Sequence, residues 1–341
     1  MVYSHCANLV ISGNTYSGYF MKVLVFGAGA VGLGLSSFLL QGGHRVHLVG
    51  KDPTVVALRE SGLKRLGIFG QASFSPQQLT ASSNLAETGR ETFDFYLICT
   101  KSFDTENSAR QLKTESTLAR QKSPIVLCQN GWGNAEIFAR FFPPKQIFNA
   151  RVITGFIRPE PNIVEVTVHA QPVHLGSLYD EDTSRLDELS DALNQGGIPS
   201  AVTNNIAKDL WAKMLYNCPL NALGAILQVP YGHLGENKES RVRMDQIVEE
   251  VFQVMQRLGH ASHWSTARDY LTTFYEKLLP STYEHESSML QDIRAGRKTE
   301  IEALNGVIVR EGKKLNLDVP HNEIVRNQIL LLQNKPIVTD S

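Results

Sequence analysis

Hydrophobic residues follow two different periods along the chain. In the first 203 residues, short apolar runs rich in valine, leucine and isoleucine alternate with stretches at helical spacing, which is typical of parallel strands joined by helices. From about Asn204 onward, apolar residues recur at helical spacing alone and glycines become fewer. The pattern predicts an α/β domain over residues 21–203 and an all-α domain over residues 204–335.

Strands are predicted where apolar runs are bounded by turn residues. Looser alternation between Val152 and Leu178, interrupted by prolines, predicts antiparallel strands that extend the sheet. Residues 62–83 contain Gly67, Gly70 and Pro76 and are predicted to be irregular. The predicted strands are Lys22–Phe26, Arg45–Val49, Phe93–Cys99, Ser123–Cys128 and Pro199–Val202.

Helices are predicted where apolar residues recur three and four positions apart. A proline inside the longest of them, Pro219, predicts a kink or a shift. The first predicted helix contains Leu33 and Leu40 and ends at Gly42-Gly43. The other predicted helices are Thr183–Asn194, Asn205–Leu227, Gln246–Leu258 and Glu286–Ile293.

The stretch from Lys22 to Leu40 carries the first candidate site. Its predicted strand leads into Gly27-Ala28-Gly29-Ala30-Val31-Gly32 and then a helix, so a G-x-G-x-x-G motif stands in the context of a dinucleotide-binding Rossmann unit. Gly27 allows the tight turn, Gly29 lets the backbone approach a pyrophosphate, and Gly32 lets the helix pack closely on the strand. The bare N–H groups of that helix then face the phosphates. The alternative is a glycine-rich turn that binds no ligand.

The end of the second strand indicates which dinucleotide is bound. An acidic residue at this place takes the ribose 2′-hydroxyl of NAD, but here Gly50 is followed by Lys51, which suits a 2′-phosphate. Asp52 comes next, and Asp52-Pro53 is better explained as a helix N-cap with proline at the first helical position. We therefore predict that Lys51 selects NADP(H); the alternative is a solvated lysine beside a helix cap.

Two more polar residues follow predicted strands. Lys101 comes after Phe93–Cys99, and Asn130 comes after Ser123–Cys128. Ligands of open α/β sheets lie outside the carboxyl ends of the strands, so both residues are expected beside a nicotinamide or a substrate. The alternatives are a surface lysine and an ordinary Asn-Gly turn.

The predicted helix Asn205–Leu227 carries a polar stripe. Lys213, Asn217 and Asn221 stand four residues apart and so line one helical face, next to an apolar face that is built to be buried. A solvated stripe is the alternative, but such stripes usually mix glutamate, lysine and arginine. The stripe therefore indicates a site on this helix.

A capping box is predicted near the end of the chain. Thr299 fits the N-cap and Glu302 fits its partner three residues later. Glu300 then occupies the first helical position, where the helix dipole favours its ionised form. Taken alone, Glu300 is explained by that dipole without any function.

The composition argues against several classes of function, namely binding of nucleic acid, membrane or metal. The 33 basic and 34 acidic residues give a net charge of −1, which provides no footprint for nucleic acid or an anionic membrane. No apolar stretch approaches the roughly 18 residues that span a bilayer. The four cysteines, at 6, 99, 128 and 218, have no C-x-x-C spacing. We expect free thiols in a reducing compartment, the cytoplasm, and no metal site.

Residues 1–20 stand apart from the predicted domains. They have neither the basic region nor the apolar core of a signal peptide. Met21 directly precedes the first strand and would make a natural start. Residues 1–20 are therefore expected to be an N-terminal extension with little order.

From Met21 to about Leu332 the chain resembles the ketopantoate reductase (2-dehydropantoate 2-reductase) family. The resemblance is carried by the glycine motif at 27–32, Thr100-Lys101, Asn130-Gly131, WAKMLYNCPLN at 211–221 and SSMLQDIRAGRKTEI at 287–301. It implies a Rossmann domain followed by a helical domain like that of 6-phosphogluconate dehydrogenase, with the site between them. It also implies NADPH-dependent reduction of ketopantoate to (R)-pantoate, for pantothenate and coenzyme A synthesis, and a possible homodimer.

The resemblance also implies residue roles. Lys213 donates the proton to the C2 oxygen, and Glu300 contacts the substrate hydroxyl and that lysine. Lys51 stands where family members often have an arginine that takes the 2′-phosphate. The implied substrate contacts are Asn130, Asn217, Asn221 and Ser288, and the implied cofactor contacts are the residues of the glycine motif, Lys51, Lys101, Asn130 and Glu300.

The residue types fit this chemistry without the family name. Hydride arriving at a ketone carbon leaves charge on oxygen, which needs a positioned proton donor. A lysine serves if a partly desolvated cleft lowers its pKa, although pairing with Glu300 would raise it. Two other functions stay open, a reductase of another 2-keto or 3-oxo acid on the same fold and a non-enzymatic NADP(H) sensor. A sensor would need only the nucleotide half.

Overall fold

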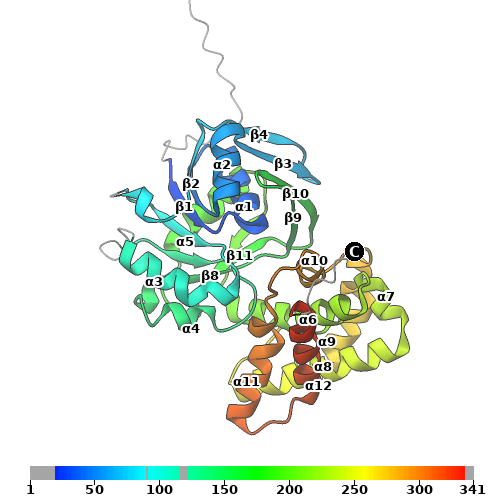
Figure 1. The fold of residues 1–341 in the computed structure, drawn as a ribbon. Helices are drawn as coiled ribbons and strands as arrows, with labels where there is room; N and C mark the ends of the chain where they lie inside the picture. Colours follow the sequence, from blue (N-terminus) through cyan, green and yellow to red (C-terminus); the bar gives the residue numbers. More distant parts are fainter. Residues whose placement is uncertain (1–19, 90, 116–121, 335–341) are drawn as a thin grey trace, which may run out of the picture.

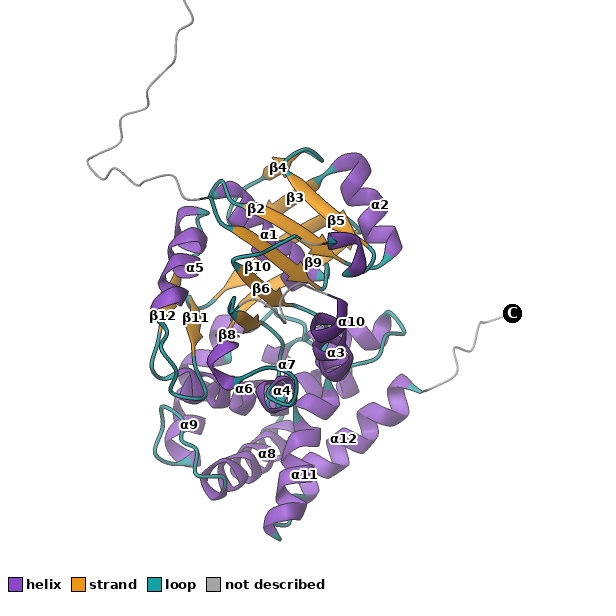
Figure 2. Cartoon of the chain, turned by 90° about the vertical axis from the view of Figure 1, so that its left-hand side faces the viewer, coloured by secondary structure: helices purple, strands orange, loops and turns teal. Residues whose placement is uncertain are grey.

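The computed structural model describes residues 20–89, 91–115 and 122–334. Figures 1 and 2 show an upper body of sheets flanked by helices and a lower body made of helices, with helix α10 (Ser288–Arg294) at their junction. The predicted class, an α/β Rossmann region followed by an all-α region, is confirmed. No helix within the described ranges is long and apolar enough to cross a membrane.

The centre of the upper body is a sheet of eight strands in the order β12-β11-β8-β7-β6-β1-β2-β5. Six strands, from β8 to β5 in this order, are mutually parallel, whereas β11 and β12 are parallel to each other and antiparallel to those six. β1 has β2 and β6 as neighbours, so the glycine motif that follows β1 lies at the middle of the carboxyl edge. The strands are β1 (Lys22–Phe26), β2 (Arg45–Val49), β5 (Leu79–Ser82), β6 (Phe95–Ile98), β7 (Ile125–Leu127), β8 (Ile147–Arg151), β11 (Val173–Gly176) and β12 (Ser200–Val202).

A second sheet of four strands packs on helix α1 (Ala30–Gln41). Its order is β4-β3-β10-β9. A Cβ atom added at Gly34 of α1 would lie 2.4 Å from the Phe156 ring of β9, so the glycine is what lets β9 approach the helix. The strands of this sheet are β3 (Leu63–Gly67), β4 (Ala72–Phe74), β9 (Thr154–Glu160) and β10 (Ile163–His169).

Helices cover the eight-stranded sheet on both faces and enclose two apolar cores. One core lies under α1 and α5 and includes the second sheet, and the other lies under α3 and α4. The helices of this region are α1, α2 (Asp52–Ser61), α3 (Thr105–Glu115), α4 (Asn134–Phe138) and α5 (Ser184–Gln195), with short 3₁₀ turns η1 (Ala86–Thr88), η2 (Ser102–Asp104) and η4 (Pro144–Gln146).

The lower body is built around α6 (Ile206–Leu227), which packs on α8, α10 and α12. Trp211 and Met214 of α6 lie in a third apolar core together with Met244 and Met255 of α8. Pro219 lies inside α6, which continues past it to Leu227. The other elements are α7 (Tyr231–Glu236), α8 (Lys238–Arg257), α9 (Ala267–Thr273), η5 (Phe274–Leu278), η6 (Pro280–Thr282), α10, η7 (Ile301–Ala303), α11 (Asn305–Leu315) and α12 (Pro320–Gln333).

Two predictions about strands are corrected. Residues 62–83 are not irregular, because β3, β4 and β5 lie there. Of the strands between Val152 and Leu178, β11 extends the main sheet as predicted, but β9 and β10 pair with each other and with β3 in the second sheet. The prediction for residues 1–20 lies outside the described residues except for Phe20. Cys99, Cys128 and Cys218 are free thiols, and Cys6 is not described.

Candidate functional site

The glycine motif forms a tight turn against the neighbouring strands. Gly27 has a φ of +111°, and a Cβ atom there would lie 2.5 Å from the Cys99 carbonyl carbon, so no other residue fits. A Cβ atom at Gly32 would lie 2.0 Å from the Gly27 oxygen, which explains the close packing of α1 on β1. Gly27 and Gly32 therefore have the geometry that the motif predicts.

The turn also fits the phosphates of a dinucleotide. Gly29 is the N-cap of α1, no side chain caps the helix, and its first turn has no acidic residue. A Cβ atom added at Gly29 would have no atom within 4 Å, so the space in front of it is open. Uncapped N–H groups at the positive end of a helix dipole bind a pyrophosphate well.

The start of α2 differs from the prediction by one residue. Lys51, not Asp52, is the N-cap, and its carbonyl oxygen accepts hydrogen bonds from the N–H groups of Thr54 and Val55. Asp52 is the first helical residue, where its carboxylate still interacts favourably with the dipole. Lys51 is exposed at the carboxyl end of β2, beside the glycine motif.

Lys213 reaches from α6 to the carboxyl edge of the sheet. Its Nζ donates hydrogen bonds to Asn130 Oδ1 at 2.7 Å and to the carbonyl oxygen of Val152 at 2.6 Å. Burial lowers the pKa of Lys213 to about 8; Glu300 acts in the opposite direction and Arg151 lowers the pKa further. This amine is therefore protonated at neutral pH and releases its proton as the pH rises through about 8.

Asn130 is placed by the glycine that follows it. Gly131 has a φ of +89°, and a Cβ atom there would lie 2.2 Å from the carbonyl oxygen of Ala303 in η7. The next N–H group, of Trp132, donates to that same oxygen at 3.1 Å. The Asn-Gly pair is therefore a turn that brings the end of β7 against the helical body, and its asparagine faces Lys213.

Glu300 joins the two bodies. Its Oε1 accepts hydrogen bonds from the backbone N–H and the hydroxyl of Ser102, both at 2.9 Å, and its Oε2 accepts one from Asn130 Nδ2 at 3.1 Å. Burial of Glu300 opposes ionisation, but Lys101 and these hydrogen bonds outweigh it and lower the pKa of the carboxyl. Asn130 bridges Glu300 and Lys213, because its amide nitrogen bonds the carboxylate and its oxygen bonds the ammonium.

The predicted capping box is wrong. Glu300, not Thr299, is the N-cap of η7, and this 3₁₀ turn ends before α11 begins. The Thr299 hydroxyl donates to Gln333, and the Glu302 carboxylate binds Arg326 instead of returning to the Thr299 N–H. Glu300 is therefore free to bond across the junction.

Lys101 also crosses the junction. Its Nζ lies 2.7 Å from Asp292 Oδ2 of α10 and 3.6 Å from Glu300 Oε2. Burial alone would lower the pKa of Lys101, but Glu300 and Asp292 outweigh it and raise that pKa. Asp292 is also bound by Arg297 at 2.9 Å. Lys101 is therefore held by the helical body at the place where a nicotinamide is expected.

The remaining candidates lie along α6 and α10. Asn217 is buried, and its amide makes no hydrogen bond within the described residues. Asn221 Oδ1 accepts a hydrogen bond from the Tyr231 hydroxyl at 2.6 Å. Ser288 is exposed at the start of α10, whereas Ser287 is buried and caps that helix. Of the two serines, Ser288 is the one open to a ligand.

Sequence reasoning missed three residues of this region. Ser102 directly follows Lys101, and Asp292 stands four residues after Ser288. Both could therefore have been found from their closeness in sequence to predicted site residues. Arg158 had no such signal, since its hydrogen-bond partners lie 104 and 130 positions away in the sequence.

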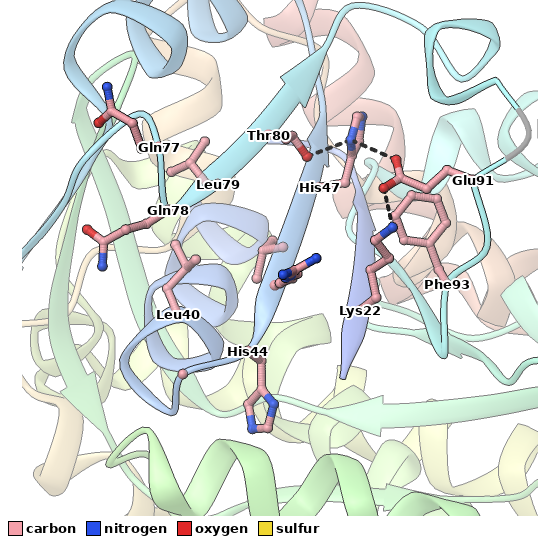
Figure 3. A pocket seen from close by; sticks show the side chains of 13 residues that line it. Lys22, Leu40, His44, His47, Gln77, Gln78, Leu79, Thr80, Glu91 and Phe93 are labelled. Carbon is pink, nitrogen blue, oxygen red and sulfur yellow. Dashed lines mark hydrogen bonds and ion pairs between the residues drawn. The ribbon is translucent and has the colours of Figure 1, made fainter. Parts of the chain in front are cut away.

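A cavity of about 430 Å³ lies elsewhere, at the opposite edge of the main sheet. Figure 3 shows the side chains that line it, among them the ion pair of Lys22 and Glu91 and the ring of His47. Lys22 and Arg45 begin β1 and β2, so this is the amino edge. Ligands of open α/β sheets bind at the carboxyl edge, where the residues described above converge.

Two family models cover most of the chain. The model described as "Ketopantoate reductase PanE/ApbA" matches residues 23–179, and the one described as "Ketopantoate reductase PanE/ApbA C terminal" matches residues 205–333. The chain is similar to the 2-dehydropantoate 2-reductase of Aquifex aeolicus, with 33% identity over 311 residues, which cover 91% of this chain and 96% of that protein.

Solved structures share the whole fold. A PanE/ApbA family ketopantoate reductase from Ralstonia eutropha superimposes with a TM-score of 0.80 at 28% identity, over 92% of this chain and 99% of that one. D-mandelate dehydrogenase, solved in a ternary structure with NADH and anilino(oxo)acetate, gives a TM-score of 0.82 at 24% identity, over 92% and 99% of the two chains. The second likeness shows the fold alone.

Proposed function

We propose, from the premise that the chain belongs to the ketopantoate reductase family, that it reduces 2-dehydropantoate (ketopantoate) to (R)-pantoate with NADPH. The observation that carries the proposal is the contact of Lys213 with Asn130, which brings an amine from the helical body to the carboxyl edge of the Rossmann sheet. The proposal includes a role in pantothenate and coenzyme A synthesis. A cytoplasmic location and a homodimer stay predictions.

In the proposed reaction, the nicotinamide of bound NADPH supplies a hydride to C2 of the keto acid. The C2–O double bond becomes a single bond, and Lys213 gives a proton from its ammonium to the oxygen. An amine with a pKa of about 8 suits this step, because it is protonated at neutral pH yet gives up its proton readily. Asn130 holds the ammonium and Glu300 favours its charge.

The other candidates have binding roles in this proposal. Asn217 and Asn221 orient the substrate from α6, and Ser288 binds its carboxylate at the start of α10, where the helix dipole also favours an anion. Lys101 and Asn130 contact nicotinamide and substrate. The free amide of Asn217 and the exposed Ser288 support these roles, since both have hydrogen-bonding capacity to offer a ligand.

The direct test follows the loss of NADPH absorbance with ketopantoate and with a panel of other 2-keto and 3-oxo acids. The proposal expects the highest kcat/KM for ketopantoate. A higher value for another acid would support the alternative reductase and contradict this substrate. No turnover with any acid, together with tight NADPH binding, would support a sensor.

The pH dependence of reduction follows from the lowered pKa of Lys213. The reaction needs the protonated amine, and the protonated fraction falls as the pH rises through about 8. We expect kcat/KM for ketopantoate to be constant below that pH and to fall above it, while pantoate oxidation, which needs the neutral amine, rises over the same range. Rates in both directions from neutral to alkaline pH check this. The same alkaline limb in Lys213→Ala would contradict the assignment.

Lys51 is expected to contribute to the choice of cofactor. We expect Lys51→Ala to raise KM for NADPH by about tenfold, since one charged hydrogen bond is lost, and to leave KM for NADH nearly unchanged. Steady-state rates with both cofactors check this. An equal change with NADPH and NADH would show that Lys51 does not recognise the 2′-phosphate.

A further inference from the structure

We propose that Arg158 is a second determinant of the preference for NADPH and that its guanidinium binds the 2′-phosphate together with Lys51. This inference rests on the proposed function and extends it to a strand outside the nucleotide-binding motif. Arg158 lies on β9 of the second sheet, far along the chain from the residues that it contacts.

The side chain of Arg158 is anchored beside the glycine motif. Its Nη1 donates hydrogen bonds to Thr54 Oγ1 at 2.9 Å and to the carbonyl oxygen of Ala28 at 3.4 Å. Thr54 belongs to the first turn of α2, and its N–H donates to the Lys51 carbonyl oxygen at 3.0 Å. Arg158 and Lys51 are therefore both adjacent to the first turn of α2, which defines the corner that they share.

The elements that meet at this corner are closely packed, and the exposed side chain of Arg158 lies on their surface. A Cβ atom at Gly50, just before Lys51, would lie 2.6 Å from the Ala28 Cβ, so the end of β2 touches the glycine motif. In the neighbouring strand β9, the ring of Phe156 packs against Gly34 of α1 and so determines how closely β9 approaches that helix. Arg158 follows two residues later, where β9 reaches the start of α1.

Within the part of the chain that the structure describes, no carboxylate neutralises the charge of Arg158. Its two hydrogen bonds go to neutral oxygens and both use Nη1; among the described residues no carboxylate forms an ion pair with it, and Nε and Nη2 make no hydrogen bond. Burial lowers the pKa of Arg158, and the positive charge of Arg297, which itself pairs with Asp292, lowers that pKa further. A guanidinium that has no carboxylate partner is stabilised by an anion that binds beside it.

The expected anion is the 2′-phosphate, because the ribose 2′ position of a dinucleotide lies at the end of the second strand of the Rossmann unit. A guanidinium binds a phosphate in a bidentate manner, whereas an ammonium is a point charge. Arg158 therefore supplies the planar donor group that Lys51 lacks. The carboxylate of Asp52 lies at the same corner and repels the negative 2′-phosphate. A single cation would therefore discriminate only weakly between NADP(H) and NAD(H).

The test compares NADP⁺ with NAD⁺, which differ only in the 2′-phosphate, by isothermal titration calorimetry on the full chain. Arg158→Gln is the variant, and Arg45→Gln is the matched control, since it removes the same charge from the exposed amino end of β2. We expect Arg158→Gln to raise the Kd for NADP⁺ by about tenfold or more and to leave the Kd for NAD⁺ nearly unchanged. We expect Arg45→Gln to change neither value. Melting temperatures of the three proteins report any loss of fold.

Each outcome decides a different point. If the wild type binds NADP⁺ no better than NAD⁺, the choice of NADPH in the proposed function fails, and the role of Arg158 fails with it. If the wild type prefers NADP⁺ and Arg158→Gln keeps the full preference, only the inference about Arg158 fails. Equal weakening of both dinucleotides would place Arg158 on a part that they share and would overturn the assignment to the 2′-phosphate.

Discussion

Replacing Lys213 by alanine is expected to lower kcat for ketopantoate reduction by about 10²–10⁴-fold, the usual contribution of a positioned general acid. The ammonium stands 2.7 Å from Asn130 Oδ1 at the junction of the two bodies. No other amine of α6 shares that position, since Lys208 of the same helix is exposed. NADPH binding is expected to change little, because the glycine motif and Lys51 lie on the Rossmann side. Steady-state kinetics and calorimetric titration with NADPH separate the two effects.

Lys208→Ala is the matched control for this experiment. It removes the same charge from the same helix, at an exposed position, and is expected to keep the wild-type kcat. Truncation of Lys213 also removes the donor to the Val152 carbonyl oxygen, at a cost of roughly 1 kcal/mol to folding, so melting curves accompany the kinetics. A turnover close to that of the wild type in Lys213→Ala would remove the proposed mechanism.

The parts of the fold that depend on local pattern were predictable. The strand, glycine turn and helix at Lys22–Leu40 were predictable because the turn between strand and helix needs glycine. The positive φ of Gly27 shows this requirement. The polar stripe on α6 follows from a spacing of four residues in one continuous helix. Both signals lie within one element, so the sequence contains all the information that they need.

The parts that depend on tertiary packing were not predictable. The strands within residues 62–83 are short, and β3 is held by pairing with β10, which lies about 100 positions further along, instead of by its own propensity. The capping box at Thr299 failed for a similar reason: the carboxylate of Glu302 finds Arg326 of α12, a better partner than the backbone N–H that it was expected to bond. Long-range charged partners override local capping rules.

Glu300 carries the second large prediction. Its carboxylate, on the helical body, accepts hydrogen bonds from Ser102 and Asn130, and lies 3.6 Å from the Lys101 ammonium, all on the Rossmann body. We expect Glu300→Gln to lower kcat/KM for ketopantoate by about 10–100-fold, through both a lower kcat and a higher KM, because Asn130 and Lys213 lose the group that orients them. The lost charged hydrogen bonds are expected to destabilise the protein by about 1.5–3 kcal/mol. Kinetics and denaturant unfolding measure the two effects.

The pH dependence of stability separates Glu300 from its neighbours. Its pKa is lowered in the folded protein, so the carboxylate contributes stability that is present above the unfolded pKa and is lost as the pH falls through the folded value. We therefore expect the difference in unfolding free energy between the wild type and Glu300→Gln to become smaller in acid. There the wild-type carboxyl is protonated, and it is then uncharged like the glutamine of the variant. Glu302→Gln is the control: this glutamate is only two positions away, but its carboxylate is 40% exposed and binds Arg326, so we expect little change in kcat. If Glu302→Gln impaired catalysis as much as Glu300→Gln, the effect would belong to the η7 turn and not to the carboxylate that joins the two bodies.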